Sequence, residues 1–482
     1  MSLTTLDSMQ WSGAQRSFRG AVYSAPREPA VWKQTITWLL FWPLLCLIAQ
    51  QAPLLSGPAR TEAFYTQGAA AGDTSDYHLS LYILVSMQLV FFLSNAQKII
   101  RQVRQNPVVL IQLVLVYAST IWSGNPGNTL RMGTELLLQT LFVTYLCVRF
   151  STQRLMKLLV FMGTASALLS ALFALALPSY GIFAGYGGGA WQGICAHKNT
   201  LGYSMAFLLT PVFFIDGMKR SRKIMYSILI LFVIGMSQCR GAQLCTPAML
   251  LFVAALRFHR RLKWRESVLF TILGLLGAGI VLAAFASSFG AIASVLGKDP
   301  SMSGRTDIFR LVWQAIQERP ILGYGYGGFW STAPQAERIG LMIGWKELGY
   351  SENGVLELGT QLGFVGVSLV VLMFAQAIRR GAKLIQPGRR NPSVEWFLTV
   401  LFLATLYNID GGLLIAYYDL SWMFILIAYM GLARETLKYR AVDPLPSSLP
   451  ENHEWQLQDQ REEWAPAQYL LADRTNASPK AN

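Results

Sequence analysis

Residues 155–177 have the sequence LMKLLVFMGTASALLSALFALAL, an apolar stretch whose single charge is Lys157. An α-helix of about 20 apolar residues crosses the hydrocarbon layer of a bilayer. Because lipid offers the backbone no hydrogen bonds, a crossing segment must be a helix or part of a closed barrel. The apolar residues are continuous rather than alternating, which favours the helix. This stretch therefore predicts a transmembrane helix.

The rest of the chain repeats this pattern and predicts an all-α polytopic membrane protein. Hydrophobic residues make up 53% of the 482 residues, charged residues only 14%, and the mean hydropathy is +0.37. A soluble domain has about 25% charged residues. About twelve transmembrane helices are expected, near residues 36–55, 79–95, 108–122, 133–149, 155–177, 200–216, 224–236, 241–256, 267–289, 355–377, 396–412 and 417–435.

The positive charges set the predicted orientation. With both termini in the cytoplasm, twenty-seven of the 40 Lys and Arg residues fall in inner segments before the distal tail. Inner loops of membrane proteins carry such an excess, so the opposite orientation is disfavoured. The formal net charge of +14 is thereby explained by loops between spans, and nucleic-acid binding is not predicted.

The predicted spans divide the chain into five regions. A loop as long as 290–354 exceeds a simple connection, and it contains a helix candidate near Gly304–Glu318 with an apolar face. The composition of 436–482 is rich in Pro, Glu, Gln and Asn, which predicts disorder. The regions are a cytoplasmic N-terminal segment (1–35), transmembrane helices 1–9 (36–289), a large periplasmic loop with short helices (290–354), transmembrane helices 10–12 (355–435) and a disordered cytoplasmic tail (436–482).

Ten Lys and Arg residues fall in the predicted outer loops, and the basic residues on this side include five of special interest: Arg131, His197, Lys198, Arg240 and Arg305. Cations near the membrane surface usually face a cavity or a partner. One shared anionic ligand explains all five, and a diphosphate suits the donor fork of arginine. The alternative is that each contacts a lipid headgroup on its own.

Acidic, aromatic and glycine residues follow on the same predicted side. Glu352 stands at the outer end of a span and is the best candidate for a general base. Tyr324 and Tyr326 stand within the G-x-G-x-x-G pattern of the long loop, where they would stack on sugars or belong to an interfacial aromatic belt. No strand precedes these glycines, so dinucleotide binding is not predicted.

The four histidines and five cysteines show no metal-ligand spacing, so neither a metal nor another cofactor is predicted. A disulfide between Cys195 and Cys239 is possible.

Several motifs resemble those of bacterial O-antigen ligases and exopolysaccharide polymerases of the Wzy type. They occur in the order typical of that family and cover about residues 185–370. One departure is Glu352, where the family usually has histidine. The similar segments are 194–202 (ICAHKNTLG; family H-K-N-x-x-G), 236–242 (MSQCRGA; S-x-S-R), 303–309 and 318–325 (SGRTDIF and ERPILGYG; G-R-x-x-[IL]-W and R-P-x-x-G-x-G), and 351–358 and 362–366 (SENGVLEL and LGFVG; H-N-x-x-L-E-L and L-G-x-x-G).

The resemblance implies a fold like that of GT-C enzymes and a metal-independent, inverting glycosyl transfer at the periplasmic face of the bacterial inner membrane. The donor would be an oligosaccharide on undecaprenyl diphosphate and the acceptor a growing polysaccharide. Expected partners are membrane lipid and, at the level of a pathway, a flippase and chain-length or export proteins. The implied site has Glu352, Arg305 and Arg240 as catalytic residues and His197, Lys198, Asn199, Arg310, Asn353, Tyr324 and Tyr326 as substrate-binding residues.

Two other functions fit the same sequence. An O-antigen ligase would transfer the glycan to lipid A core instead of extending it, and it shares these motifs. A transporter of a lipid-linked sugar would also have many spans. Transporters, however, gather polar residues at mid-membrane, whereas here they gather at the outer ends of the spans.

Overall fold

The computed structural model describes residues 95–183, 189–263, 266, 305–343, 349–385, 390–411, 414–417 and 419–442. These residues form helices and connecting segments without a strand, apart from one isolated bridge between Ile182 and Trp191. The predicted spans at 36–55 and 267–289, nearly all of the span at 79–95, the N-terminal segment 1–35, loop residues 290–304 and the tail after 442 lie outside the described residues.

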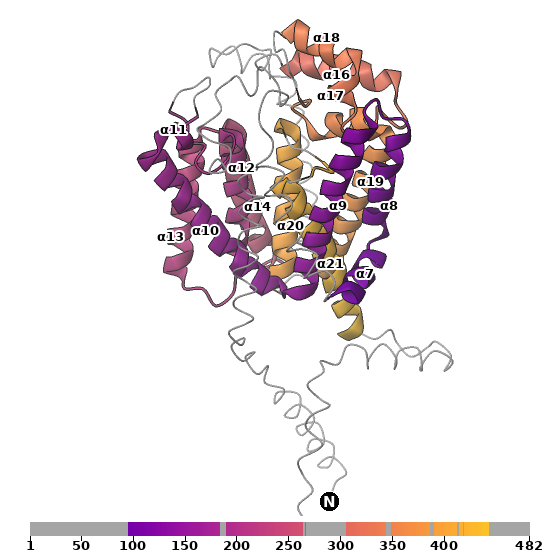
Figure 1. Cartoon of the computed structure of the whole chain (residues 1–482). Coiled ribbons are helices and arrows are strands. Elements are labelled where there is room, and N and C mark those ends of the chain that lie inside the picture. Colours follow the sequence, from indigo (N-terminus) through magenta and orange to yellow (C-terminus); the bar gives the residue numbers. More distant parts are fainter. Residues whose placement is uncertain are drawn as a thin grey trace, which may run out of the picture. The chain divides into compact units, whose positions relative to one another are not determined.

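The described helices are arranged as a bundle with a smaller group of helices at one end (Figure 1). In order they are α7 (Ala96–Arg104), α8 (Pro107–Ala118), η2 (Ser119–Ile121), α9 (Pro126–Arg149), α10 (Thr152–Ala176), α11 (Pro178–Gly181), α12 (Lys198–Leu209), η3 (Thr210–Phe213), α13 (Arg220–Ser237), α14 (Arg240–His259), α16 (Arg305–Glu318), α17 (Phe329–Thr332), α18 (Pro334–Ile343), α19 (Gly354–Leu384), α20 (Pro392–Asp410) and α21 (Leu420–Val442).

Each of the nine predicted spans that fall within the described residues coincides with a helix. Five of these helices, α10, α14, α19, α20 and α21, are long and apolar enough to cross a membrane. The α-helical membrane class is confirmed, and the protein is a multi-pass membrane protein. The total of twelve spans and the orientation stay predictions. One difference concerns residues 436–442, which belong to α21 rather than to an irregular tail.

Contacts divide the chain into two units, Met1–Ala433 and Arg434–Asn482. In the second unit, the last turns of α21 carry an ion pair between Lys438 and Glu435 (3.0 Å). The arrangement described below is that of the first unit alone.

The core of the first unit lies between α12, α20 and α21. Its largest fully buried side chains include Trp396, Phe397, Trp422 and Phe424. Large apolar residues elsewhere are exposed on the outer faces of several helices, and examples are Leu175, Ile228, Leu251 and Val371. Soluble monomers rarely expose so much apolar surface, so these faces are those that contact lipid.

Helix α19 has a sharp kink at Gly363, whose φ of 61° and ψ of −162° are non-helical. The kink frees backbone N–H groups that the loop before α17 satisfies. Phe364 donates to the carbonyl of Pro320 (2.7 Å), and Val365 donates to that of Ile321 (3.2 Å). Most helix kinks arise at a proline or where a side chain inserts between hydrogen-bonded turns. Here a second backbone segment, residues 320–321, accepts the hydrogen bonds instead.

The glycine pattern of this loop explains how it enters the kink. Tyr324 and Gly325 donate backbone hydrogen bonds to the carbonyls of Thr360 (2.8 Å) and Gln361 (2.9 Å). A Cβ at Gly323 would lie 2.6 Å from the Thr360 oxygen, so only glycine permits this approach. The G-x-G motif therefore packs backbone against backbone.

The helix predicted near Gly304–Glu318 is confirmed as α16, and with α17 and α18 it forms a small layer at one end of the helix bundle (Figure 1). The predicted apolar face is also confirmed. Ile308, Val312, Ala315 and Ile316 are buried in one cluster, and Leu311 packs against it.

A Gly363→Ala substitution is expected to destabilise the protein by about 1–3 kcal/mol, because this φ/ψ region is essentially restricted to glycine. The added Cβ would also lie 2.3 Å from the Ile321 carbonyl oxygen. Thermal unfolding of the purified protein in detergent measures the change. Gly235→Ala is the matched control, because a Cβ there meets nothing within 4 Å. Equal stability of both variants would contradict the proposed role of the kink.

Candidate functional site

The start of α12 holds the H-K-N motif in a defined geometry. His197 is the N-cap residue, and its Nδ1 accepts a hydrogen bond from the backbone N–H of Asn199 (3.1 Å). The imidazole meets the ring of Phe183 edge to face at 4.7 Å, and the Lys198 ammonium lies 5.3 Å from the same ring centroid. Burial, with a smaller contribution from Lys198, lowers the pKa of His197 to about 4. His197 is therefore a neutral acceptor, and Lys198 carries the charge of the motif.

Two motifs meet where α12 passes the turn between α13 and α14. A Cβ at Gly202 would lie 2.5 Å from the Cβ of Cys239, which shows how closely the two segments approach. Trp191 adds a backbone hydrogen bond to the carbonyl of Met236 (2.9 Å). Arg240 is the first residue of α14 and is exposed at this turn. Lys198 and Arg240 thus belong to helix starts at the same end of the first unit.

The carboxylate of Glu357 lies in the first turn of α19 and is 2% exposed. It accepts hydrogen bonds from the indole N–H of Trp330 (2.9 and 3.0 Å), the backbone N–H of Ser351 (2.8 Å) and the side chain of Gln361 (2.6 Å). These bonds tie α17, the turn before α19 and α19 itself to one buried group. The L-E-L motif contains this residue, but the motif alone does not predict its role.

The turn before α19, which Glu357 holds through Ser351, also contains Glu352. This residue has a left-handed φ of +56°, which is uncommon for a residue other than glycine, and it is 8% exposed. Its Oε2 lies close to Gly411, the residue that follows α20. A Cβ atom built on Gly411 would lie 3.8 Å from this oxygen. Asn353 caps α19 through Oδ1 and donates to the carbonyl of Ile409 (3.3 Å). The strained backbone of Glu352 is thus held from both sides.

Tyr407 lies near both Glu352 and the turn that precedes Arg240. Its phenol, on the last turns of α20, lies within electrostatic range of Asp419, Tyr350, Cys239 and Glu352. Its ring lies 3.9 Å, centroid to centroid, from that of Tyr203 on α12. Residues from four segments far apart in the sequence therefore converge around one tyrosine, and Arg240 directly follows Cys239.

Arg131 lies at the start of α9 and is engaged within the protein. Its guanidinium pairs with Glu135 (3.0 Å) and donates to the side chain of Asn128 (2.9 Å). It also hydrogen-bonds the side chain of Tyr417.

Two further predicted site residues, Arg305 and Arg310, lie on α16. Arg305 begins α16, and Arg310 forms an exposed ion pair with Asp307 on the same helix (2.9 Å). No disulfide joins Cys195 to Cys239, and both are buried thiols. This corrects the sequence-based suggestion.

The two loop tyrosines are buried, with 6% of Tyr324 and 2% of Tyr326 exposed. Tyr324 donates to the Ala315 carbonyl (3.1 Å), and burial with the nearby Glu318 raises its pKa to about 12. Tyr326 donates to the carbonyl of Ile415 (2.6 Å). In this structure neither ring offers a face on which a sugar would stack. Their contacts instead hold the loop between α16 and α17 against α16 and residue Ile415.

Comparison with known proteins agrees with this geometry. The sequence model of the family described as O-antigen ligase matches residues 225–371, which include Arg240, Arg305, Glu352 and Glu357. The chain resembles the O-antigen ligases. The exopolysaccharide production protein ExoQ of Rhizobium meliloti (strain 1021) is 23% identical over 303 residues, which cover 60% of this chain and 69% of that protein. The resemblance drawn from the motifs is confirmed, and it covers the turn, the loop and the kinked helix described above.

The depressed pKa of His197 predicts a pH-dependent stability. Because its pKa falls from an ordinary 6.5 to about 4, the unfolded chain binds a proton more readily than the folded one. The stability that depends on neutral His197 is therefore present above pH 6.5 and is lost as the pH falls toward 4. Thermal unfolding between pH 4 and 7.5 measures this loss. His197→Asn keeps a capping side chain without the titration, and its stability should fall less over that range.

Proposed function

We propose that this protein polymerises oligosaccharide repeat units linked to undecaprenyl diphosphate into exopolysaccharide, at the periplasmic face of the inner membrane. The observation that carries this proposal is the convergence around Tyr407. It brings the turn that precedes Arg240 near a strained, buried Glu352 at one end of a set of membrane helices. A carboxylate beside fixed cations suits attack on a donor with an anionic leaving group. The family match and the similarity to ExoQ support the same class of enzyme.

The proposed reaction is a single displacement. A hydroxyl of the acceptor glycan forms a bond to the anomeric carbon of the donor while the bond from that carbon to the diphosphate oxygen breaks. Glu352 accepts the hydroxyl proton, and the lipid diphosphate leaves with the electron pair. Arg240, Arg305 and Lys198 neutralise its growing negative charge without a metal ion. One displacement inverts the configuration at the anomeric carbon.

The remaining residues act by position in this proposal. His197 and Asn199 fix the start of α12 and so the place of Lys198. Glu357 and Asn353 fix the turn that carries Glu352. Arg310, exposed on α16, would meet the donor glycan or its diphosphate at the same end of the bundle. Preorganised groups of this kind need no rearrangement when charge develops.

A ligase is the second candidate, because the matching family model is described as O-antigen ligase. The chemistry at the donor would be the same, and only the acceptor would differ. Long lipid-linked glycans as product support the polymerase, whereas glycan on lipid A core supports the ligase.

Arg240→Ala and Arg305→Ala are each expected to lower turnover about 100- to 1000-fold, as the loss of one charge-stabilising donor does in other enzymes. The assay uses the purified chain and a short oligosaccharide on undecaprenyl diphosphate, with and without EDTA, and follows glycan length. Arg338→Ala removes a cation from the exposed surface of α18 and is the matched control. Full turnover by both variants would exclude the proposed diphosphate site, and loss of activity in EDTA would exclude the metal-independent reaction.

Glu352→Gln is expected to lower kcat at least 100-fold with little change in KM, because glutamine keeps the shape but does not accept the proton. Glu352→His should restore part of the rate, since histidine is the residue that the related enzymes usually have there. Glu337→Gln, on the exposed surface of α18, is the control for loss of a carboxylate. Unchanged kcat in Glu352→Gln would remove this residue from the mechanism.

A further inference from the structure

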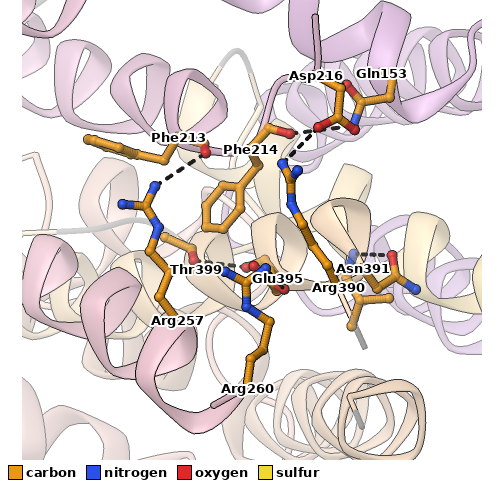
Figure 2. A network of polar contacts seen from close by, with 11 residues as sticks. Gln153, Phe213, Phe214, Asp216, Arg257, Arg260, Arg390, Asn391, Glu395 and Thr399 are labelled. Atoms are coloured by element: carbon orange, nitrogen blue, oxygen red, sulfur yellow. Dashed lines mark hydrogen bonds and ion pairs between the residues drawn. The ribbon is translucent and has the colours of Figure 1, made fainter. Parts of the chain in front are cut away.

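A second group of charges lies at the opposite ends of α13 and α14 from the candidate site. Figure 2 shows Arg257, Arg260 and Arg390 directed toward a turn formed by residues 213–216 and toward the start of α20. Lys223 joins them from the first turn of α13. We name Lys223, Arg257, Arg260 and Arg390 the basic cluster.

The acids near the basic cluster do not balance its charge. Arg260 pairs with Glu395 (3.3 Å), which is buried, and Arg390 pairs with Asp216 (2.7 Å), which is half-exposed. The other two cations donate to neutral backbone groups. Arg257 donates to the Phe213 carbonyl (3.4 Å) and Lys223 to the Ile215 carbonyl (2.5 Å). Four cations and two carboxylates leave a formal excess of two positive charges in this group.

The cations are also close enough to repel one another. Arg257 lies within electrostatic range of Arg260 and Arg390, and Lys223 within range of Arg257 and Arg390. Inner loops of membrane proteins are often basic, and their cations usually extend separately into solvent. Here side chains from three different segments converge instead, and bringing like charges close together costs free energy even where solvent screens them. A bound anion would offset that cost.

The position of the cluster indicates which anion. It lies at the ends of α14 and α20, both long and apolar enough to cross a membrane, so it stands at the level of lipid headgroups. Exposed apolar side chains adjoin two of its members in sequence, namely Phe258 beside Arg257 and Ile224 beside Lys223. Apolar side chains next to cations in this way suit a ligand that has both an acyl chain and a phosphate.

We propose that the basic cluster binds the phosphate of an anionic membrane lipid, at the end of the helix bundle remote from the proposed glycosyl transfer. The lipid phosphate accepts hydrogen bonds from Arg257 and Arg390 and neutralises the excess charge. Because the cations belong to α13, α14 and the segment before α20, the bound lipid also holds these elements together. The site is independent of the reaction proposed above.

The test titrates the full-length protein in neutral detergent with phosphatidylglycerol and reads bound lipid by native mass spectrometry. Phosphatidylcholine and inorganic phosphate are titrated in parallel. Arg257→Gln with Arg390→Gln removes two cations and leaves the buried Arg260–Glu395 pair intact. The matched control is the double variant Arg379→Gln with Lys383→Gln. It removes two exposed cations from the C-terminal end of α19.

Each cation near a lipid surface contributes about fivefold in affinity, so the double variant of the cluster should bind phosphatidylglycerol about 25-fold more weakly. The control variant should bind it as the wild type does, and the wild type should prefer phosphatidylglycerol to phosphatidylcholine. Equal losses in both variants would show that only general positive charge attracts the lipid, and this overturns the proposal. Displacement of the lipid by inorganic phosphate at equal concentration would also overturn it, because the acyl chains would then contribute nothing.

Discussion

The buried carboxylate of Glu357 accepts hydrogen bonds from Trp330, Ser351 and Gln361, and these bonds join α17, the turn before α19 and α19 itself. A buried carboxylate without such donors would be strongly destabilising, so the three donors are required where they are. Satisfying them fixes the layer of short helices, the turn that carries Glu352 and the first turns of α19 in one geometry. The strained backbone of Glu352 persists because both of its neighbours are held, which is the usual condition for strain at functional sites.

A second constraint acts through the backbone. The kink of α19 at Gly363 exposes polar groups that a membrane helix must satisfy, and the loop around Gly323 and Gly325 supplies the partners. The loop between α16 and α17 is therefore part of the hydrogen bonding of the helix bundle. The glycines of the G-x-G pattern allow the loop backbone to pack against the backbone of α19. Tyr324 and Tyr326, which stand between these glycines, are buried.

The two ends of the first unit use charge in different ways. At the end with the candidate site, Lys198 and Arg240 stand at the starts of α12 and α14, an arrangement that suits the proposed anionic leaving group. At the other end, the arginines are partly neutralised by Glu395 and Asp216 and surround a turn between helices. The first arrangement suits chemistry, and the second suits a stably bound ligand.

The sequence by itself determined the membrane class, the helices over the nine described spans, helix α16 with its apolar face, and the family resemblance. These follow from local properties, namely continuous apolar runs, periodicity and short motifs. Only the tertiary structure decided that Tyr324 and Tyr326 are buried, that Arg310 pairs with Asp307, and that Glu357 organises the turn of Glu352. Each of these depends on which distant segments meet, as Gly202 meets Cys239 and Gly323 meets Thr360. The spacing of motifs along the chain does not predict which segments come into contact. These contacts form only when helices pack and buried polar groups find hydrogen-bond partners.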